Sequence, residues 1–234
     1  MLVGVGRALR AGGHAAVSLR VLAVGAHMDD CEFGAGGTLA KHALAGDAVM
    51  ILVMTRGIDT RADSMPLEAQ QQRALDAAQA LGATVVILGY PDQSLDTLRR
   101  FELTQDVEKV IKGLEPEVVY THHRGDRNLD HRITYDAVVT ACRPLPGSQV
   151  RAVYSFEVPS STEWGDEAFW PTAFVDVSGE PWERKQKALR CYGDEVRDYP
   201  HPRSSVGIAA LARWRGVTAG YDLAEAFELV RERR

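Results

Sequence analysis

Histidine and acidic side chains gather in two short segments of this 234-residue chain. Residues 26–32 read Ala-His-Met-Asp-Asp-Cys-Glu, and residues 121–132 read Thr-His-His-Arg-Gly-Asp-Arg-Asn-Leu-Asp-His-Arg; each segment follows an apolar run. His27 and Asp30 are three positions apart, so one helical turn or a tight loop brings both to the same side. His131 can complete a set of two histidines and one carboxylate.

Such a set is typical of catalytic zinc, because three protein ligands leave a coordination position for water. Asp29 then points away from the metal and is free to take a proton from that water. The two adjacent carboxylates would otherwise repel each other, and a divalent cation removes this penalty. We therefore expect a Zn²⁺ cofactor bound by His27, Asp30 and His131, with Asp29 as the general base.

Other interpretations of these residues exist. Asp29 or Asp30 can cap the helix that follows, which for a single residue is the commoner role. His27, Asp29 and His131 also match the facial triad of non-haem Fe(II) oxygenases, although those sites normally lie on all-β scaffolds. A third possibility is an α/β module that binds a sugar or nucleotide without catalysis, which needs no Asp29–Asp30 pair. We assign neither His122 nor His123 as a ligand.

The elements that must position the two segments alternate between short apolar runs and amphipathic stretches. Unbroken β-branched runs indicate strands covered on both faces, so the fold class is α/β, with a mostly parallel sheet and helices on both faces. The active site of such a sheet lies beyond the carboxyl ends of its strands, where both segments fall. We expect strands at 21–25, 48–54, 84–88, 117–121, 150–158 and 173–177, and helices at 36–45, 66–81, 103–114, 130–142, 181–192, 204–215 and 223–233.

Composition is that of a globular protein with a real core: 45% of the residues are hydrophobic and 25% are charged. The net charge of −5 is scattered, and no apolar run approaches the ~20 residues of a membrane helix, so we expect neither nucleic acid nor a membrane as a partner. Three cysteines without a CxxC spacing favour a reducing cytoplasm. Residues 1–20 read as an N-terminal extension, and 21–234 as a single domain.

Residues 26–32 resemble the Ala-His-Pro-Asp-Asp-Glu signature of the PIG-L (LmbE-like) de-N-acetylase family, and Asp-His-Arg at 130–132 resembles its second motif. The family pattern has further matches in this chain: Thr-Arg-Gly at 55–57, Arg73, Pro-Asp at 91–92 and Ala-Glu-Ala-Phe at 224–227. The resemblance implies a Rossmann-like fold, zinc on His27, Asp30 and His131, and Asp29 as the base. It also implies N-acyl amino-sugar substrates, such as N-acetylglucosamine conjugates.

The chain departs from the family pattern at a few positions. Met28 replaces the usual proline, and Cys31 separates the aspartates from Glu32. Asn128 lies where the pattern has the histidine expected to stabilise the oxyanion, and a neutral amide does this more weakly. His201, held between prolines, is our replacement for that histidine, the alternative being a histidine of a surface loop.

Further residues are assigned to the substrate. Arg56, Arg73, Asp92 and Asn128 are expected to contact it, with surface ion pairs as the alternative for the two arginines. Three aromatic residues of one loop, Trp164, Phe169 and Trp170, could form a subunit contact or a substrate lid. We expect a homo-oligomer.

Overall fold

The computed structural model describes residues 18–58 and 65–234. The predicted extension up to residue 17 therefore lies outside the described residues. The strands are β1 (Arg20–Gly25), β2 (Ala48–Thr55), β3 (Thr84–Tyr90), β4 (Val118–His122), β5 (Ala152–Phe156), β6 (Ala173–Asp176) and β7 (Ala224–Glu232). The α-helices are α1 (Asp30–Leu44), α2 (Leu67–Leu81), α3 (Arg100–Leu114), α4 (Leu129–Ala141), α5 (Glu180–Cys191) and α6 (Ser205–Ala219), and short 3₁₀ turns are η1 (Leu95–Thr97), η2 (Thr162–Trp164) and η3 (Gly193–Glu195).

The strands form one seven-stranded sheet in the order β3-β2-β1-β4-β5-β7-β6. The five strands from β3 to β5 in this order are parallel to one another, and β7 runs antiparallel to its neighbours β5 and β6. The order β3-β2-β1-β4-β5 is that of a doubly wound Rossmann-type sheet. The predicted α/β class with a mostly parallel sheet is confirmed.

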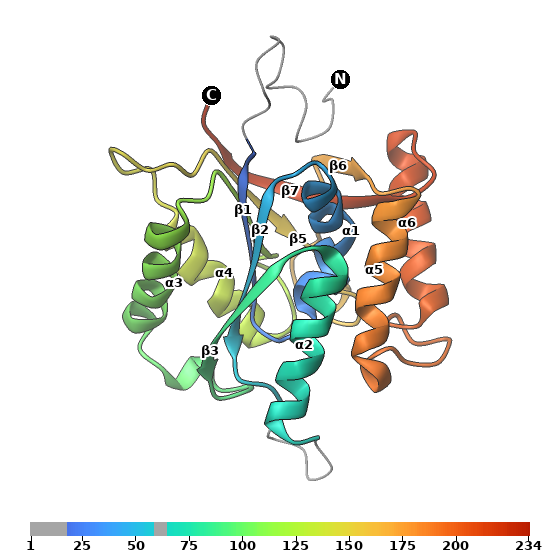
Figure 1. Cartoon of the computed structure of the whole chain (residues 1–234), viewed down its shortest axis with the longest axis horizontal. Coiled ribbons are helices and arrows are strands. Elements are labelled where there is room, and N and C mark those ends of the chain that lie inside the picture. Colours follow the sequence, from blue (N-terminus) through green and yellow to red (C-terminus); the bar gives the residue numbers. More distant parts are fainter. Residues whose placement is uncertain (1–17, 59–64) are drawn as a thin grey trace.

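Helices cover both faces of the sheet, with α3 and α4 on one side and α1, α2, α5 and α6 on the other (Figure 1). Successive side chains of β1 enter opposite cores: Val21 and Ala23 pack with α1 and α2, whereas Leu22 and Val24 pack with α3 and α4. All four are fully buried. This double coverage is why the strand sequences are unbroken apolar runs rather than alternating ones.

The order of the strands reverses next to β1, which lies between β2 and β4. Successive connections leave the sheet in opposite directions at this point, and ligands bind there in open α/β sheets. The segment 26–32 follows β1 and the segment 121–132 includes the end of β4, so the topology brings both to one edge.

One predicted element is wrong: the helix expected at 223–233 is strand β7, which pairs with β5 and β6. The helix expected at 36–45 is present as α1, but it begins six residues earlier, at Asp30. Strand β1 also begins at Arg20, inside the predicted extension.

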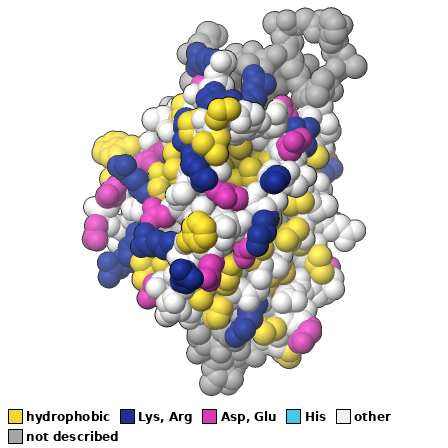
Figure 2. Space-filling view, turned by 90° about the vertical axis from the view of Figure 1, so that its left-hand side faces the viewer, with side chains coloured by type: hydrophobic (Ala, Val, Ile, Leu, Met, Phe, Trp, Pro, Cys, Tyr) yellow, Lys and Arg dark blue, Asp and Glu magenta, His cyan; other side chains and the backbone are white. Residues whose placement is uncertain are grey.

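The molecular face that carries α3 mixes Lys and Arg side chains with Asp and Glu side chains, in keeping with the scattered charges of the sequence (Figure 2). Among the described residues, no helix combines the length and the hydrophobicity needed to cross a bilayer.

Candidate active site

The loop from β1 to α1 and the first residue of α1 hold three of the predicted site residues, His27, Asp29 and Asp30. The geometry of this loop is set by the backbone N–H of His27, which donates to Asp30 Oδ2 at 2.7 Å. Asp30 is the first residue of α1 and is fully buried. Asp29 occupies the N-cap position, but its side chain makes no capping hydrogen bond, so capping does not account for this carboxylate.

Three side chains meet at the edge of the sheet, those of His27, Asp30 and His131, which we call the triangle. His27 Nδ1 lies 3.2 Å from His131 Nε2, and each oxygen of Asp30 approaches one histidine: Oδ2 lies 3.3 Å from His27 Nδ1, and Oδ1 lies 3.3 Å from His131 Nε2. One ligand atom of each residue lies within 4.8 Å of the others, and ligands ~2.1 Å from a tetrahedral zinc lie ~3.4 Å from one another, so the group is of a size to hold such an ion. Asp30 Oδ1 is buried without a hydrogen-bond partner, as a carboxylate oxygen meant for a metal would be.

The carboxylates around His27 also favour a bound cation at this position. Burial alone lowers the pKa of His27, but the carboxylates of Asp30, Asp130 and Asp92 outweigh it and raise the pKa well above its usual value. Burial likewise lowers the pKa of His131, and Asp30 and Asp126 raise it. A bound divalent ion would supply the same positive charge.

The other nitrogen of His27 faces a second group of carboxylates. His27 Nε2 lies 3.4 Å from Asp92 Oδ1 and 3.5 Å from Asp130 Oδ2. A histidine that binds metal through one nitrogen donates the other N–H to a carboxylate, which fixes the tautomer and the ring orientation. Asp92 and Asp130 are placed for this role, although with His27 they form a second three-residue group of metal-ligating type. The side chain of Gln93 also reaches His27 Nε2, at 3.0 Å.

The loop after β4 orients His131. Asp126 Oδ1 lies 3.1 Å from His131 Nδ1 and also accepts the hydroxyl of Ser161. Burial raises the pKa of Asp126, but His131 and the hydroxyl outweigh it and bring the pKa to about 2. Asn128 is the N-cap of α4, and its Oδ1 accepts from the backbone N–H of Asp130 at 2.8 Å.

His122 and His123 are both buried and belong to no metal-ligating group of the described residues. The His122 ring stacks on His131 with centroids 3.9 Å apart. Burial, followed by the charge of His131, lowers the pKa of His122 to about 4, so this ring is neutral near pH 7. His123 lies 3.0 Å from Glu228 and supports the far side of the loop.

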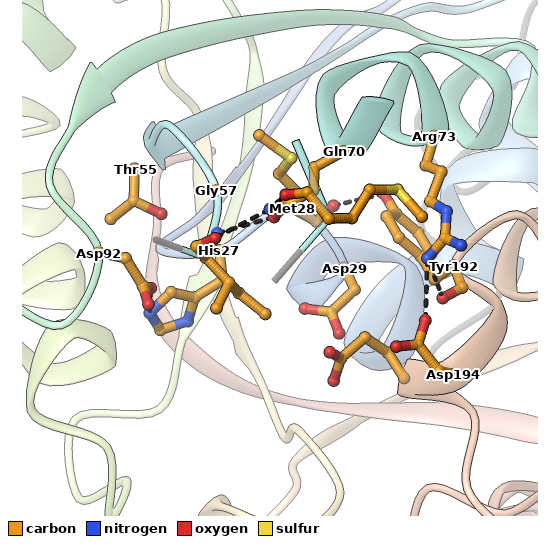
Figure 3. A pocket seen from close by; sticks show the side chains of 13 residues that line it. His27, Met28, Asp29, Thr55, Gly57, Gln70, Arg73, Asp92, Tyr192 and Asp194 are labelled. Carbon is orange, nitrogen blue, oxygen red and sulfur yellow. Dashed lines mark hydrogen bonds and ion pairs between the residues drawn. The ribbon is translucent and has the colours of Figure 1, made fainter. Parts of the chain in front are cut away.

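A pocket of about 110 Å³ opens beside the triangle. His27 and Asp92 lie at one end, Arg73, Tyr192 and Asp194 at the other, and Asp29 between them (Figure 3). Burial raises the pKa of Asp29, while Arg203 lowers it. A buried carboxylate with a raised pKa beside the triangle is suited to take a proton from a nucleophilic water.

Other predicted site residues lie farther from the triangle or are engaged elsewhere. Arg73 lines the far end of the pocket and donates to Tyr192 O at 3.0 Å and Asp194 Oδ1 at 2.9 Å. Arg56 and His201 are not among the described residues that line the pocket. His201 lies in the turn before α6, where its Nδ1 accepts the backbone N–H of Arg203.

Two residues with clear roles in this geometry were not predicted from the sequence. Asp126 holds His131, and its position in the motif-bearing loop was the available signal. Arg203 holds Asp29 from a turn that follows α5 and η3. No local pattern marks this arginine, because its partner lies 174 positions away.

Residues 22–142 match the family model GlcNAc-PI de-N-acetylase (PIG-L). The chain is 32% identical over 176 residues to the uncharacterized deacetylase YaiS of Escherichia coli K12, covering 73% of this chain and 88% of that protein. It is 29% identical over 198 residues to a 4-oxalmesaconate hydratase of Pseudomonas putida, covering 73% and 71% of the two chains. The crystal structure of N,N'-diacetylchitobiose deacetylase from Pyrococcus horikoshii superposes with a TM-score of 0.74 at 21% identity, covering 91% of this chain and 84% of that one.

Proposed function

Because this chain belongs to the GlcNAc-PI de-N-acetylase (PIG-L) family, and is thereby a hydrolytic N-deacetylase, we propose that it uses zinc to remove an N-acyl group from an amino sugar or sugar conjugate. The removed group is acetyl in the simplest case. The observation that carries this proposal is the triangle of His27, Asp30 and His131 beside the pocket that contains Asp29.

His27, Asp30 and His131 would hold the zinc, which supplies a bound water of lowered pKa and polarises the acyl carbonyl. Asp92, Asp130 and Asp126 keep the two imidazoles in the orientation and tautomer that a ligand needs. The attack of the water also requires a base that accepts its proton. The facial-triad alternative has less support, since Asp30 rather than Asp29 meets the histidines and the scaffold is α/β.

Asp29 takes the proton of the attacking water and returns it to the leaving amine. Its neighbour Arg203 donates to Asp29 Oδ2 at 3.0 Å and so fixes the direction in which the other oxygen points. In this mechanism the single carboxylate of Asp29 carries out both proton transfers. Asp29 is 7% exposed, which keeps bulk water from competing for that proton.

The oxyanion requires a donor besides the metal. His201 Nδ1 accepts a backbone N–H, so in the neutral ring the proton lies on Nε2, which is free to donate. Asn128 has its oxygen committed to the cap of α4, which leaves only its amide N–H groups. His201 stays the donor proposed from the sequence, and its turn adjoins Arg203, the partner of Asp29, although its ring is not among the described side chains that line the pocket. For Asn128 we propose a positioning role.

The charged groups that line the pocket are largely paired within the protein. Arg203 pairs with Asp29 and Glu195, and Arg73 pairs with Asp194. Asp92 lies 3.4 Å from His27 Nε2. Among the described residues that line the pocket, the one guanidinium, that of Arg73, is therefore already engaged and is not a ready anchor for an anionic substrate.

We further propose that the enzyme works in a reducing cytoplasm as a homo-oligomer. All three cysteines are free thiols. Trp164 is 57% exposed and Trp170 is 75% exposed, which suits a subunit contact.

The deciding experiment measures the metal content of the purified protein and the release of free amine from a panel of N-acetylated sugars. We expect about one zinc per chain and amine release that chelation abolishes and zinc restores. A parallel assay follows the addition of water to unsaturated carboxylates by absorbance. Hydration without amine release would show that this chain shares the chemistry of the hydratase relative instead.

A further inference from the structure

Two hydroxyl groups hold the carboxylate that orients the proposed metal ligand His131, and both come from one segment after β5. This η2 segment, residues 158–164, contains Ser161 and Thr162. Asp126 Oδ1 lies 3.1 Å from His131 Nδ1 and accepts the hydroxyl of Ser161. Asp126 Oδ2 accepts the hydroxyl of Thr162 at 2.5 Å. The two donors lie 35 and 36 positions from Asp126 along the chain, outside both segments in which histidine and acidic residues gather.

The proton of the Thr162 hydroxyl is directed at Asp126 by a second hydrogen bond. Thr162 Oγ1 accepts the backbone N–H of Val158 at 2.8 Å, and the backbone N–H of Thr162 donates to Val158 O at 3.0 Å. A threonine hydroxyl has a single proton to donate. Because the N–H of Val158 occupies one side of the oxygen, this proton is available to Asp126 Oδ2 on the other.

The contact is closed off from bulk water, since Asp126, Ser161 and Thr162 are all buried. A buried acceptor that loses its hydrogen-bond partner costs the full desolvation penalty of the group, and a charged acceptor costs more than a neutral one. Without the Thr162 hydroxyl, Asp126 Oδ2 loses its donor. The carboxylate can then turn away from His131 Nδ1 in search of another.

The backbone of the η2 segment is fixed by the side chain of Glu163. Its two carboxylate oxygens accept the backbone N–H groups of Ser160 at 2.7 Å and Ser161 at 3.1 Å. Ser160 has φ +68°, in the left-handed region that residues other than glycine seldom adopt. Such a conformation persists only where the surrounding contacts determine it. The two hydroxyls are therefore presented from a turn of well-defined shape.

The same segment also contacts the partner of the proposed base. Pro159 O accepts from Arg203 Nε at 3.3 Å, and Arg203 Nη1 donates to Asp29 Oδ2 at 3.0 Å. The η2 segment thus adjoins the metal ligand on one side, through Asp126, and Asp29 on the other, through Arg203. Support of the reacting groups is a role that the position of this segment fits.

We propose that Thr162, together with Ser161, is a positioning residue of the metal centre: it acts through Asp126 to hold the His131 imidazole in the orientation and tautomer that bind zinc. In this tautomer Nδ1–H donates to Asp126 and Nε2 is left for the metal. The inference rests on the proposed function only in requiring a metal on His131. It extends the metal centre to a part of the chain that carries none of its ligands.

The test measures the zinc affinity of variants by competition with a chromophoric chelator. Thr162→Val removes the hydroxyl and nearly keeps the shape of the side chain, and it should weaken zinc binding by about tenfold, the lower end of the roughly 10–100-fold effect of groups that orient metal ligands. Thr162→Ser keeps the hydroxyl and should retain most of the affinity. Unchanged zinc affinity in Thr162→Val would overturn the proposal.

Thr134→Val is the matched control. Thr134 is buried on α4, three residues after His131, and its hydroxyl has no hydrogen-bond partner among the described residues. The same substitution beside the same ligand should therefore leave the zinc affinity unchanged. An equal loss in Thr134→Val and Thr162→Val would mean that the affinity follows the packing of threonine and not the hydrogen bond to Asp126, and the proposal would fail.

A double-mutant cycle tests whether Thr162 acts through Asp126. Asp126→Ala should weaken zinc binding by itself, and adding Thr162→Val to it should cause no further loss, because the contact is already gone. Fully additive losses would reject the proposed route. Circular dichroism checks the fold of each variant, and Ser161→Ala, which removes the other hydroxyl, carries the same test if Thr162→Val does not fold.

Zinc affinity needs no turnover, so the outcome separates this inference from the proposed function. Zinc binding that depends on the Thr162 hydroxyl supports the inference even if the protein releases amine from none of the sugars, a result that would reject the proposed function alone. Amine release by a protein whose zinc affinity is the same with and without the Thr162 hydroxyl would reject the positioning role alone.

Discussion

Arg203 Nη1 donates to Asp29 Oδ2 over 3.0 Å, and this contact joins the turn before α6 to the proposed general base. The guanidinium is itself held in place: it lies 4.8 Å from the centre of the Phe33 ring and donates to Pro159 O at 3.3 Å. It also lies 3.6 Å from Glu195. Arg203 is therefore a positioning residue, which acts on the reaction through Asp29.

Arg203→Ala should lower kcat while zinc content and fold are retained. Without its partner, the Asp29 carboxylate can rotate, and a misplacement of ~1 Å in a reacting group costs on the order of a hundredfold in rate. Arg203→Lys should recover part of the loss, because a single ammonium can replace one donor but not the guanidinium geometry. The measurement is kcat and KM in the free-amine assay, with metal analysis of each variant.

Arg215→Ala is the matched control. Arg215 is also 17% exposed, pairs with Glu157 at 2.7 Å, and lies over an aromatic ring, that of Phe169 at 5.6 Å. Its removal should cost stability in the same way without reaching the reaction. An equal loss of kcat in Arg215→Ala would mean that Arg203 acts through the fold and not through Asp29.

The pH profile gives a second readout of the same pair. Burial raises the pKa of Asp29 and Arg203 lowers it. A general base must be deprotonated, so kcat/KM falls on the acid side as the pH drops through this pKa. Removal of the cation raises the pKa of Asp29, and the acid limb should move to higher pH in Arg203→Ala but stay in place in Arg215→Ala.

Zinc binding should depend on each member of the triangle. His27→Ala, Asp30→Ala and His131→Ala should each lose bound zinc after dialysis, because three protein ligands leave little redundancy. Asp194→Ala removes a carboxylate from the opposite rim of the pocket and should keep the metal. Elemental analysis checks all four, and full occupancy in any of the first three variants removes that residue from the ligand set.

Asp29→Asn should separate catalysis from metal binding. The amide preserves the size of the side chain and cannot take the proton, so turnover should fall by ~10²–10⁴ while zinc and fold persist. Metal analysis and circular dichroism accompany the rate measurement. A variant within a few-fold of the unaltered enzyme would assign the base to another residue.

Much of this arrangement could be predicted from the sequence because local patterns determine it. The runs that became β1, β2 and β4 are apolar on both faces, and the residues after β1 and β4 reach one edge in any parallel sheet of this order. The spacing of three residues between His27 and Asp30 then places their side chains on the same side of the loop and the first turn of α1. His131 joins them because a short loop, residues 123–128, links the end of β4 to the start of α4 at the same edge of the sheet.

The misassigned C-terminal element shows where local patterns fail. Residues 224–232 contain alanine, glutamate and leucine, which favour helices, and no strongly alternating run. They form β7 because β5 and β6 offer pairing edges on both sides, and because buried Glu225 pairs with Lys185 of α5. Tertiary context overrides propensity here. The Arg203–Asp29 contact was equally hidden, since it depends on how α6 packs.

Asn128 and His201 provide the last test, because we propose His201, and not Asn128, as the donor to the oxyanion. His201→Ala should lower kcat by ~10²–10³ with little change in KM, which is the signature of a donor that acts mainly in the transition state. Asn128→Ala should act differently: its oxygen caps α4, so the loss should appear as about 0.5–2 kcal/mol of unfolding free energy.

The two readouts separate the roles, because a cap contributes to stability and an oxyanion donor contributes to rate. Asn128→Asp is the decisive companion: aspartate caps a helix as well as asparagine does but has no amide N–H to donate. If the cap is the whole role of Asn128, Asn128→Asp should recover the stability that Asn128→Ala loses, and kcat should change far less than in His201→Ala. A silent His201→Ala combined with a collapse of kcat in both Asn128 variants would assign the oxyanion to the amide of Asn128.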